Sequence, residues 1–406
     1  MTNIIRDLAL SLLIAVAIFM VLNIFAWTYL QNSSGADGRG PIKWQLNPRN
    51  SKGVAIRKKA LGTEDEQRLR DLENSPTLRS HTVLNFTVGK SNAAYTMGIE
   101  GIRYESGWDN ARVQAMLEND STSYVFGGST TFGHGVGSDQ TVPAYLNDID
   151  PGGNYLNFGI NAYDSLREVD KLVYLLRQGY RPKKVIFIDG LNDITTFTST
   201  PHRAHDKPRA QGYLIDRGSP ALIFGSGGQK NKLLAFAYSL PITHLYYQLF
   251  KPQEFLPYGS VDSNLQRVDY GSLSYHYANQ FTYGIENIEA IKADWIEYYR
   301  ENIAFVKGLA DAFDFEVVFV FQPFGVVEEE NPFLFPAYFD SPGIVVAQEF
   351  TAAAARAIED GALDMLDCQD AFSDIDKSRA FVDATHYSPS ANEALAKCIL
   401  EGSVQN

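Results

Sequence analysis

Cysteine and basic residues are scarce in this sequence, and each shortage excludes a class of protein. Only two of the 406 residues are cysteine, which rules out a zinc ribbon or a small disulfide-rich fold. Lysine and arginine number 35 against 48 aspartates and glutamates, for a formal net charge of −13. Because phosphate backbones are bound by clustered basic side chains, we do not expect nucleic acid as a partner. Hydrophobic residues make up 45% of the chain, so most of it is expected to fold.

Charge is also absent from one long segment near the N-terminus. Residues 8–30, "LALSLLIAVAIFMVLNIFAWTYL", contain no charged side chain. At ~1.5 Å per residue, a helix of this length crosses the ~30 Å hydrocarbon layer of a membrane. A cleaved signal peptide is the alternative, but its apolar region usually spans about 7–15 residues and ends at an A-x-A-like site, which is not found here. We therefore predict a transmembrane anchor within residues 1–34.

The charges that flank this segment do not settle on which side of the membrane the rest of the chain lies. Arg6 precedes the segment, while Arg39, Lys43 and Arg49 follow it, so a literal positive-inside count places the large domain in the cytoplasm. The N-terminal flank is short, however, and long domains are translocated largely regardless of charge. Sidedness must be inferred from other features.

The two cysteines bear on the same question. Cys368 and Cys398 lie near the C-terminus, and the sequence is compatible with two buried thiols or with a disulfide between them. A disulfide would imply an oxidising compartment. We expect a single-pass membrane protein whose large domain is extracytoplasmic, on the periplasmic or cell-surface side.

The chain after the apolar segment divides into three parts. Residues 35–60 are rich in glycine, asparagine, serine and proline, and we predict a polar tether there. Residues 61–122 show no strong periodic pattern and are expected to pack on the main domain as an N-terminal extension. The main domain is predicted at 123–402. It contains an aromatic-rich insertion at about 195–283, which forms either a helical subdomain with its own core or part of a substrate cleft.

Short apolar runs and helix-spaced apolar residues alternate through the main domain. The runs "SYVF", "NYLNF", "KVIFID" and "EVVFVF" are typical of buried strands, whereas "SLREVDKLVYLLRQG" and "IENIEAIKADWIEYYRENIAFVKGLADAF" have helical spacing. This alternation predicts a three-layer α/β/α sandwich with a parallel central sheet. Ligands of such folds bind beyond the carboxyl ends of the strands, so functional residues are expected immediately after strands.

Polar or glycine residues follow three of the predicted strands. Ser129 follows "SYVF" after two glycines, Gly159 follows "NYLNF", and Asn192 follows "KVIFID". Late in the chain, "FVDATHYSP" places Asp383 three residues before His386, close enough for one turn to bring the carboxylate to the imidazole. Each of these residues alone is typical of a turn, a helix cap or a packed side chain. Together they provide the groups of a serine hydrolase.

At this point the sequence resembles the SGNH, or GDSL-like, hydrolase family. Four blocks occur in the family's order: "GGSTTFG" for the nucleophile, "NFGINAYDS" for the glycine, "GLND" for the asparagine and "DATH" for the aspartate and histidine. The resemblance covers roughly residues 123–400 and implies a flavodoxin-like fold. The chain departs from it in reading "GGST" where many members have "GDS".

The resemblance implies a role for each residue of the blocks. Ser129 would be the nucleophile, His386 its general base and then acid, and Asp383 the group that orients the imidazole. The backbone N–H groups of Ser129 and Gly159 and the side-chain amide of Asn192 would form the oxyanion hole. Neither a cofactor nor a metal is expected.

Two other histidine candidates are weaker. The pair in "HRAH" at 202–205 has a metal-like spacing but lies in a Pro-rich, charged stretch with no further ligand cluster, so we do not predict zinc there. His134 follows the nucleophile block and either belongs to the loop or lines the pocket.

These features favour hydrolysis of a carboxylic ester through an acyl-enzyme intermediate. With a membrane anchor at 8–30 and an aromatic insertion, we expect an O-acetylated envelope or extracellular polysaccharide, or peptidoglycan, as the substrate. Three alternatives stay open: a polysaccharide O-acetyltransferase that uses the same serine, a lipase or thioesterase, and a glycan-binding assembly factor without activity. The sequence leaves protein partners unknown.

Overall fold

The chain separates into two compact units, and the structure describes mainly the second. The first comprises Met1–Lys43 and Ile215–Leu273, and the second comprises Trp44–Leu214 and Ser274–Asn406. A computed structural model describes residues 18–25, 51–73, 95–161, 163–198, 288–334 and 342–405. Within the first unit, only residues 18–25 are described, and they are helical.

The membrane anchor expected at residues 8–30 lies mostly outside the described residues. No helix in the described part of the chain is both long and apolar enough to span a bilayer.

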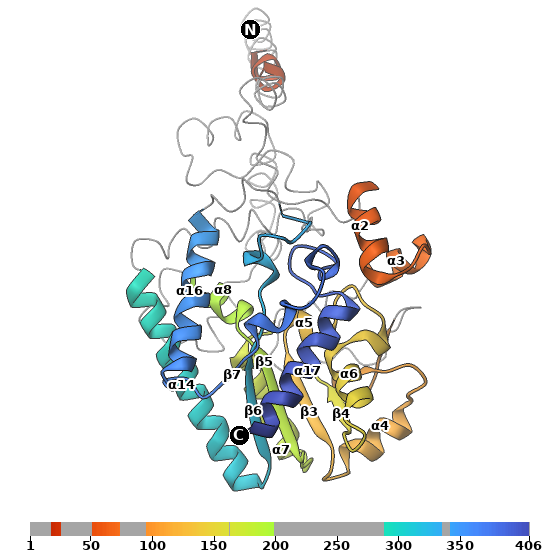
Figure 1. Ribbon diagram of the computed structural model, residues 1–406, viewed down its shortest axis with the longest axis vertical. Coiled ribbons are helices and arrows are strands. Elements are labelled where there is room, and N and C mark those ends of the chain that lie inside the picture. Colours follow the sequence, from red (N-terminus) through yellow and green to blue (C-terminus); the bar gives the residue numbers. More distant parts are fainter. Residues whose placement is uncertain are drawn as a thin grey trace, which may run out of the picture. The chain divides into compact units, whose positions relative to one another are not determined.

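A seven-stranded sheet forms the centre of the second unit (Figure 1). Its strands are β1 (Thr96–Met97), β2 (Arg103–Tyr104), β3 (Ser123–Gly127), β4 (Tyr155–Asn157), β5 (Lys184–Asp189), β6 (Glu316–Phe321) and β7 (Leu366–Asp367). They are ordered β1-β2-β4-β3-β5-β6-β7. Strands β3 to β7 pair in parallel, whereas β2 runs antiparallel to both of its neighbours. The predicted all-parallel sheet is therefore corrected to a mixed one.

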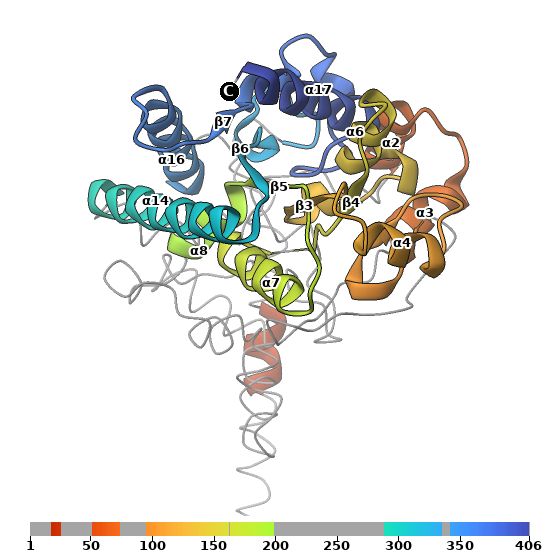
Figure 2. The same cartoon turned by 90° about the horizontal axis from the view of Figure 1, so that it is seen from below.

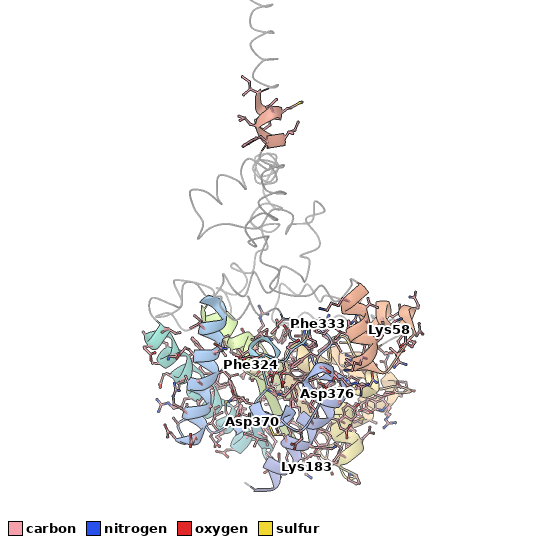
Figure 3. The ribbon with its side chains drawn as sticks, turned by 45° about the horizontal axis from the view of Figure 1, so that its top comes forward. Lys58, Lys183, Phe324, Phe333, Asp370 and Asp376 are labelled. Atoms are coloured by element: carbon pink, nitrogen blue, oxygen red, sulfur yellow. A yellow bond between two sulfur atoms is a disulfide. The ribbon has the colours of Figure 1, made fainter. Side chains whose placement is uncertain are left out.

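The order of the five parallel strands places the candidate site. Numbered among themselves, β3 to β7 have the order 2-1-3-4-5 of flavodoxin-like doubly wound sheets, in which ligands bind at the carboxyl ends where the order reverses. That reversal lies between β3 and β5, the strands that precede Ser129 and Asn192. Figure 3 shows the polarity: Lys183, just before β5, lies on the opposite side of the domain from Phe324 and Phe333, which follow β6.

Helices cover both faces of the sheet (Figures 1 and 2). One face packs against α4 (Asn110–Leu117), α7 (Ser165–Arg177), α14 (Ile288–Phe313) and α16 (Pro342–Glu359). The other packs against α6 (Val142–Ile149) and α17 (Pro389–Gln405). The short helices α5 (Ser129–Phe132) and α8 (Leu191–Thr198) follow β3 and β5 directly. The predicted three layers are thus present.

Alternation along the strands divides the core into two clusters. On β5, Phe187 joins the cluster under α7 and α14, whereas its neighbours Ile186 and Ile188 join the cluster under α6 and α17. This is the period of two expected of a strand buried on both faces. Phe187 also stacks on Phe126 of β3 and Phe319 of β6, with ring centroids 5.3 Å apart in both pairs. The aromatic row ties together the strands that carry the site.

Local capping explains where several helices begin. Asp109 and Asp164 precede α4 and α7, and their carboxylates accept hydrogen bonds from the N–H groups of Arg112 and Arg167. The side chain of Thr141 caps α6 in the same way. The second residue of α6 is proline, which has no backbone N–H that would need a partner in the first turn.

Residues 51–73 and 95–122 are more structured than their sequence pattern indicates. Helix α2 (Ser51–Leu61) begins inside the stretch predicted as tether, and Lys59 of α2 donates to the Ser378 hydroxyl at 2.9 Å. The extension at 61–122 contains α3 (Glu66–Glu73) and α4, and it contributes β1 and β2 to the central sheet. Of the insertion predicted at 195–283, residues 199–283 lie outside the described residues.

A disulfide joins Cys368, directly after β7, to Cys398 in α17. Of the two alternatives compatible with the sequence, the structure therefore contains the bonded pair.

Candidate active site

The turn after β3 brings Ser129 to the carboxyl end of the sheet. Gly128 forms the N-cap of α5, and Ser129 is the first residue of this helix. A Cβ atom at Gly128 would lie 2.2 Å from Nδ2 of Asn192, so only glycine lets that amide approach the turn. The carbonyl of Ser129 accepts hydrogen bonds from the N–H groups of Gly133 and His134, at 3.0 and 2.9 Å, which holds its backbone.

Ser129, His386 and Asp383 form a continuous chain of hydrogen bonds. Nε2 of His386 lies 2.8 Å from Oγ of Ser129, and Nδ1 of His386 lies 2.7 Å from Oδ2 of Asp383. The serine and the histidine are 257 residues apart in the sequence. His386 is buried, while Ser129 and Asp383 are partly exposed. The three predicted residues therefore meet, with each imidazole nitrogen facing one partner.

The environment of Asp383 keeps its carboxyl group ionised. Burial alone would raise its pKa, but the imidazole of His386 and hydrogen bonds to the carboxylate lower the pKa below its usual range. Oδ1 accepts the backbone N–H groups of Thr385 and His386, both at 2.8 Å, which leaves Oδ2 for the imidazole. A carboxylate in this position favours the tautomer with the proton on Nδ1, so that Nε2 can accept the proton of Ser129.

Two contacts hold the loop that carries the aspartate and the histidine. The N–H of Val382 donates to the carbonyl of His386 at 2.9 Å, which closes the loop. Asn331, after β6, donates from Nδ2 to the carbonyl of Ala384 at 3.1 Å. The second contact ties the backbone of the loop to the segment that follows β6.

Asn192 lies beside the nucleophile turn. Its Nδ2 donates to the carbonyl of Tyr163 at 2.7 Å, which fixes the plane of the side-chain amide next to Gly128. The structure thus brings Asn192 to the turn that carries Ser129, as the sequence predicts.

Gly159 serves a packing role that its sequence block does not indicate. Its N–H donates to Oδ1 of Asn157 at 2.9 Å. A Cβ atom at Gly159 would lie 2.2 Å from the backbone nitrogen of Phe132, so glycine is required for β4 to approach α5. In this geometry the predicted oxyanion donor is already engaged with Asn157.

His134 packs beside the histidine of the hydrogen-bonded chain. Its ring centroid lies 4.4 Å from that of His386, and the residue is buried. Burial and the neighbouring His386 lower the pKa of His134 to about 3, so its imidazole is neutral at neutral pH. His134 therefore belongs to the wall of the site.

One group of possible metal ligands occurs among the described residues. His134, Asp383 and His386 offer ligand atoms that all lie within 4.8 Å of one another. Two of the three already form the hydrogen-bonded chain with Ser129. The "HRAH" pair at 202–205 lies outside the described residues.

Two buried polar residues that no sequence motif predicts also support the site. Arg103 of β2 donates from Nη1 to the carbonyls of Phe132 and Gly133, both at 2.6 Å, and so holds the chain that follows the nucleophile turn. Gln322, directly after β6, accepts a hydrogen bond from Thr130. In the sequence, Arg103 is marked only as an arginine between apolar residues, and Gln322 only as a polar residue at the end of a predicted strand.

A cluster of buried carboxyl groups lies next to α8. Glu168 of α7, Asp189 of β5 and Asp193 of α8 are all nearly inaccessible. Burial raises the pKa of Glu168 and Asp193, and the charge of Asp189 raises both further. The carboxylate oxygens of Asp193 accept hydrogen bonds from the hydroxyl groups of Ser165 and Tyr299, with oxygen–oxygen distances of 2.6 and 3.2 Å. The three carboxyl groups come from α7, β5 and α8, and Tyr299 adds a contact from α14.

Comparisons with known proteins return structural similarity only. No protein-family model matches the chain, and no curated protein matches its sequence. An acetyl xylan esterase is 9% identical, with a TM-score of 0.33, over 69% of this chain and 98% of its own. An acetylxylan esterase from Geobacillus stearothermophilus is 11% identical, with a TM-score of 0.34, over 70% and 95%. A GDSL-like lipase from Bacteroides thetaiotaomicron is 13% identical, with a TM-score of 0.30, over 72% and 95%. At such values the likeness establishes neither activity nor substrate.

Proposed function

We propose that this chain is a serine ester hydrolase of the SGNH, or GDSL-like, type. The observation that carries the proposal is the unbroken hydrogen-bonded chain from Asp383 through His386 to Ser129. A serine hydroxyl is a weak nucleophile until an adjacent base removes its proton, and here Nε2 of His386 is that base. Asp383 holds the imidazole in the required tautomer and stabilises the imidazolium that forms.

The proposed reaction has two halves. Oγ of Ser129 attacks the ester carbonyl as its proton passes to Nε2 of His386, and the imidazolium then gives this proton to the departing alkoxide. The acyl group stays on Ser129. In the second half His386 takes a proton from water, the resulting hydroxide attacks the acyl carbon, and the serine recovers its proton from the imidazolium.

The oxyanion hole is proposed from two donors beside the nucleophile. They are the backbone N–H of Ser129, at the start of α5, and the side-chain amide of Asn192, whose position is fixed by Tyr163. Such donors stabilise the negative charge that develops on the carbonyl oxygen. Gly159 can add a third N–H only if this group leaves Oδ1 of Asn157.

For the substrate, we propose an O-acetyl ester on an envelope or extracellular polysaccharide. The uncharged segment at 8–30 supports a membrane anchor, and the disulfide between Cys368 and Cys398 supports an oxidising, extracytoplasmic compartment. A topology reporter fused after Asn406 tests the sidedness, and a cytoplasmic signal would contradict it.

Trapping the acyl-enzyme tests the proposed chemistry. The protein is mixed with p-nitrophenyl acetate, quenched in acid and digested, and the peptides are examined by mass spectrometry. We expect an acetyl group on the peptide that contains Ser129. The matched control is Ser373→Ala, which alters an exposed serine and should leave the acetylation unchanged. Ser129→Ala should abolish it, and acetylation confined to other residues would contradict the proposal.

A further inference from the structure

One buried side chain, that of Gln322, contacts both the residue next to Ser129 and the residue next to His386. Gln322 is the first residue after β6, at the carboxyl end of the sheet, and only 3% of its surface is exposed. Its backbone N–H donates to the carbonyl of Asp189 at 3.2 Å, which ties it to the end of β5. The backbone of Gln322 is therefore anchored to the sheet, and its side chain extends from the end of β6.

The carboxamide oxygen of Gln322 accepts two hydroxyl groups. Oγ1 of Thr130 donates to Oε1 at 2.6 Å, and the hydroxyl of Tyr387 lies 3.1 Å from the same oxygen. The Tyr387 hydroxyl also contacts the carbonyl of Pro323, so its single proton is shared between two acceptors. Thr130, Tyr387 and Gln322 are all buried, and hydrogen bonds between buried groups are costly to break.

Both hydroxyl residues are sequence neighbours of proposed catalytic residues. Thr130 directly follows Ser129, and Tyr387 directly follows His386. Ser129 lies on a helix of only four residues, and His386 lies in a loop whose regular pairing is a single bridge between Phe381 and Tyr387. Each element has its own local backbone hydrogen bonds, but none of these joins the turn of Ser129 to the loop of His386. The side-chain amide of Gln322 is hydrogen-bonded to both the helix of Ser129 and the loop of His386, and so links the two.

We propose that Gln322 is a positioning residue that sets the separation between Oγ of Ser129 and Nε2 of His386. It acts through Thr130 and Tyr387 and touches neither of the two reacting atoms. A neutral amide oxygen accepts hydrogen bonds from both hydroxyl groups without placing another charge in the interior. This inference rests on the proposed esterase function, because the separation matters only if the proton passes between these atoms.

Replacing the acceptor tests the inference. Gln322→Met keeps the length of the side chain and removes Oε1. A misplacement of about 1 Å at a reacting centre can cost about 10²-fold in rate, so we expect kcat for p-nitrophenyl acetate to fall about 10–100-fold, with KM within about two-fold. Gln322→Glu keeps an oxygen acceptor but adds an ionisable group to the interior, so its kcat should lie between those of Gln322→Met and the wild type. A role in folding alone would lower stability without this selective loss of kcat.

A double-mutant cycle isolates the network. Thr130→Val and Tyr387→Phe each remove one hydroxyl and keep the shape of the side chain, and each should lower kcat less than Gln322→Met does. Adding either change to Gln322→Met should lower kcat little further, because the shared acceptor is already lost. The matched control is Asn392→Leu, which removes a buried amide that donates to the carbonyl of Gln140 at 2.8 Å. It should lower the Tm and leave kcat unchanged.

The outcomes separate this inference from the proposed function. The rate at which a fluorophosphonate labels Ser129 is measured beside kcat for every variant. If wild-type protein shows neither turnover nor labelling that depends on Ser129, the proposed function fails and the inference fails with it. If the wild type is active and folded Gln322→Met keeps the wild-type kcat and labelling rate, only the inference fails. Should Gln322→Met not fold, an unchanged kcat in the Thr130→Val, Tyr387→Phe double variant overturns it.

Discussion

At the scale of single residues, the proposed chemistry depends on how His386 is held between two partners. Its Nδ1 faces Asp383 and its Nε2 faces Ser129, at 2.7 and 2.8 Å. Because the carboxylate accepts from Nδ1, the ring presents an unprotonated nitrogen to the serine. The two contacts therefore have different roles: one selects the tautomer, and the other transfers the proton.

Asp383→Asn tests the tautomer assignment. The amide can occupy the same space, but its nitrogen would donate to Nδ1 and leave the proton on Nε2. We expect an intact fold and a kcat lowered by up to about 10⁴-fold. Steady-state kinetics and circular dichroism of the same sample check this. A kcat within a few-fold of the wild type would contradict the role given to Asp383.

Asn192→Ala and Gly159→Ala should separate an oxyanion donor from a packing residue. Removing the Asn192 amide should lower kcat by about 10²–10³-fold with little change in KM, because one transition-state donor is lost. Gly159→Ala should instead lower stability, because its Cβ would meet the backbone of Phe132 at 2.2 Å. Kinetics and thermal unfolding of both variants distinguish the two effects. An Asn192→Ala enzyme with wild-type kcat would be incompatible with the proposed oxyanion hole.

At the scale of elements, α7, β5 and α8 each contribute one buried carboxyl group to a cluster next to Asn192. Burial and the nearby Asp189 raise the pKa of Glu168 well above its usual value of 4.5. The folded protein therefore binds this proton more tightly than the unfolded chain does. The corresponding stabilisation is fully present below pH 4.5 and is lost as the pH rises through the pKa of the folded state.

Glu168→Gln tests this linkage. The amide imitates the protonated acid and cannot lose a proton, so the free energy of unfolding should decline less steeply above pH 4.5 in the variant than in the wild type. Urea unfolding at a series of pH values between 5 and 9 measures both slopes. Equal slopes would mean that Glu168 is not the group that retains the proton. Glu359→Gln, at an exposed position, is the matched control and should leave the slope unchanged.

The elements also show which parts of the fold are predictable from sequence. The runs at Ser123, Lys184 and Glu316 are strands as predicted, because strands buried on both faces are continuous apolar segments. By contrast, β1 and β2 have two residues each, too few for any periodic pattern. Their place in the sheet depends on tertiary contacts such as those of Arg103, which no local pattern encodes.

The same limit applies to the candidate site. Ser129, Asp383 and His386 could be identified because each lies in a short local motif, and the structure brings them within hydrogen-bonding distance. Gln322 could not, because its partners Thr130 and Tyr387 are 192 and 65 residues away in the sequence. For Gly159 the motif is local, but the engagement of its N–H by Asn157 depends on side-chain geometry.

At the scale of the whole molecule, the described residues 51–73 and 95–122 are part of the folded domain. Helix α2 contacts the chain just before Asp383, through Lys59 and Ser378, and β2 supplies Arg103. A chain that begins at Asn50 retains all of these elements. It should be soluble and keep kcat within about two-fold of the full-length protein, because only residues that precede α2 are removed.

A shorter chain that begins at Asn119 gives the contrasting result. It lacks α2, α3, β1, β2 and α4, and with them the buried Arg103 and one edge of the sheet. We expect it to lose cooperative unfolding in urea and to lose activity. An active, cooperatively folded product would show that the segment before Ser123 is dispensable.

The turnover of p-nitrophenyl acetate by Ser129→Ala, His386→Ala and the double variant, beside the wild type, tests the central claim most directly. The two residues act as one unit in the proposed mechanism. Each single change should therefore nearly abolish kcat, and the double variant should be no slower than either single variant. A Ser129→Ala enzyme that keeps wild-type turnover would contradict the whole account.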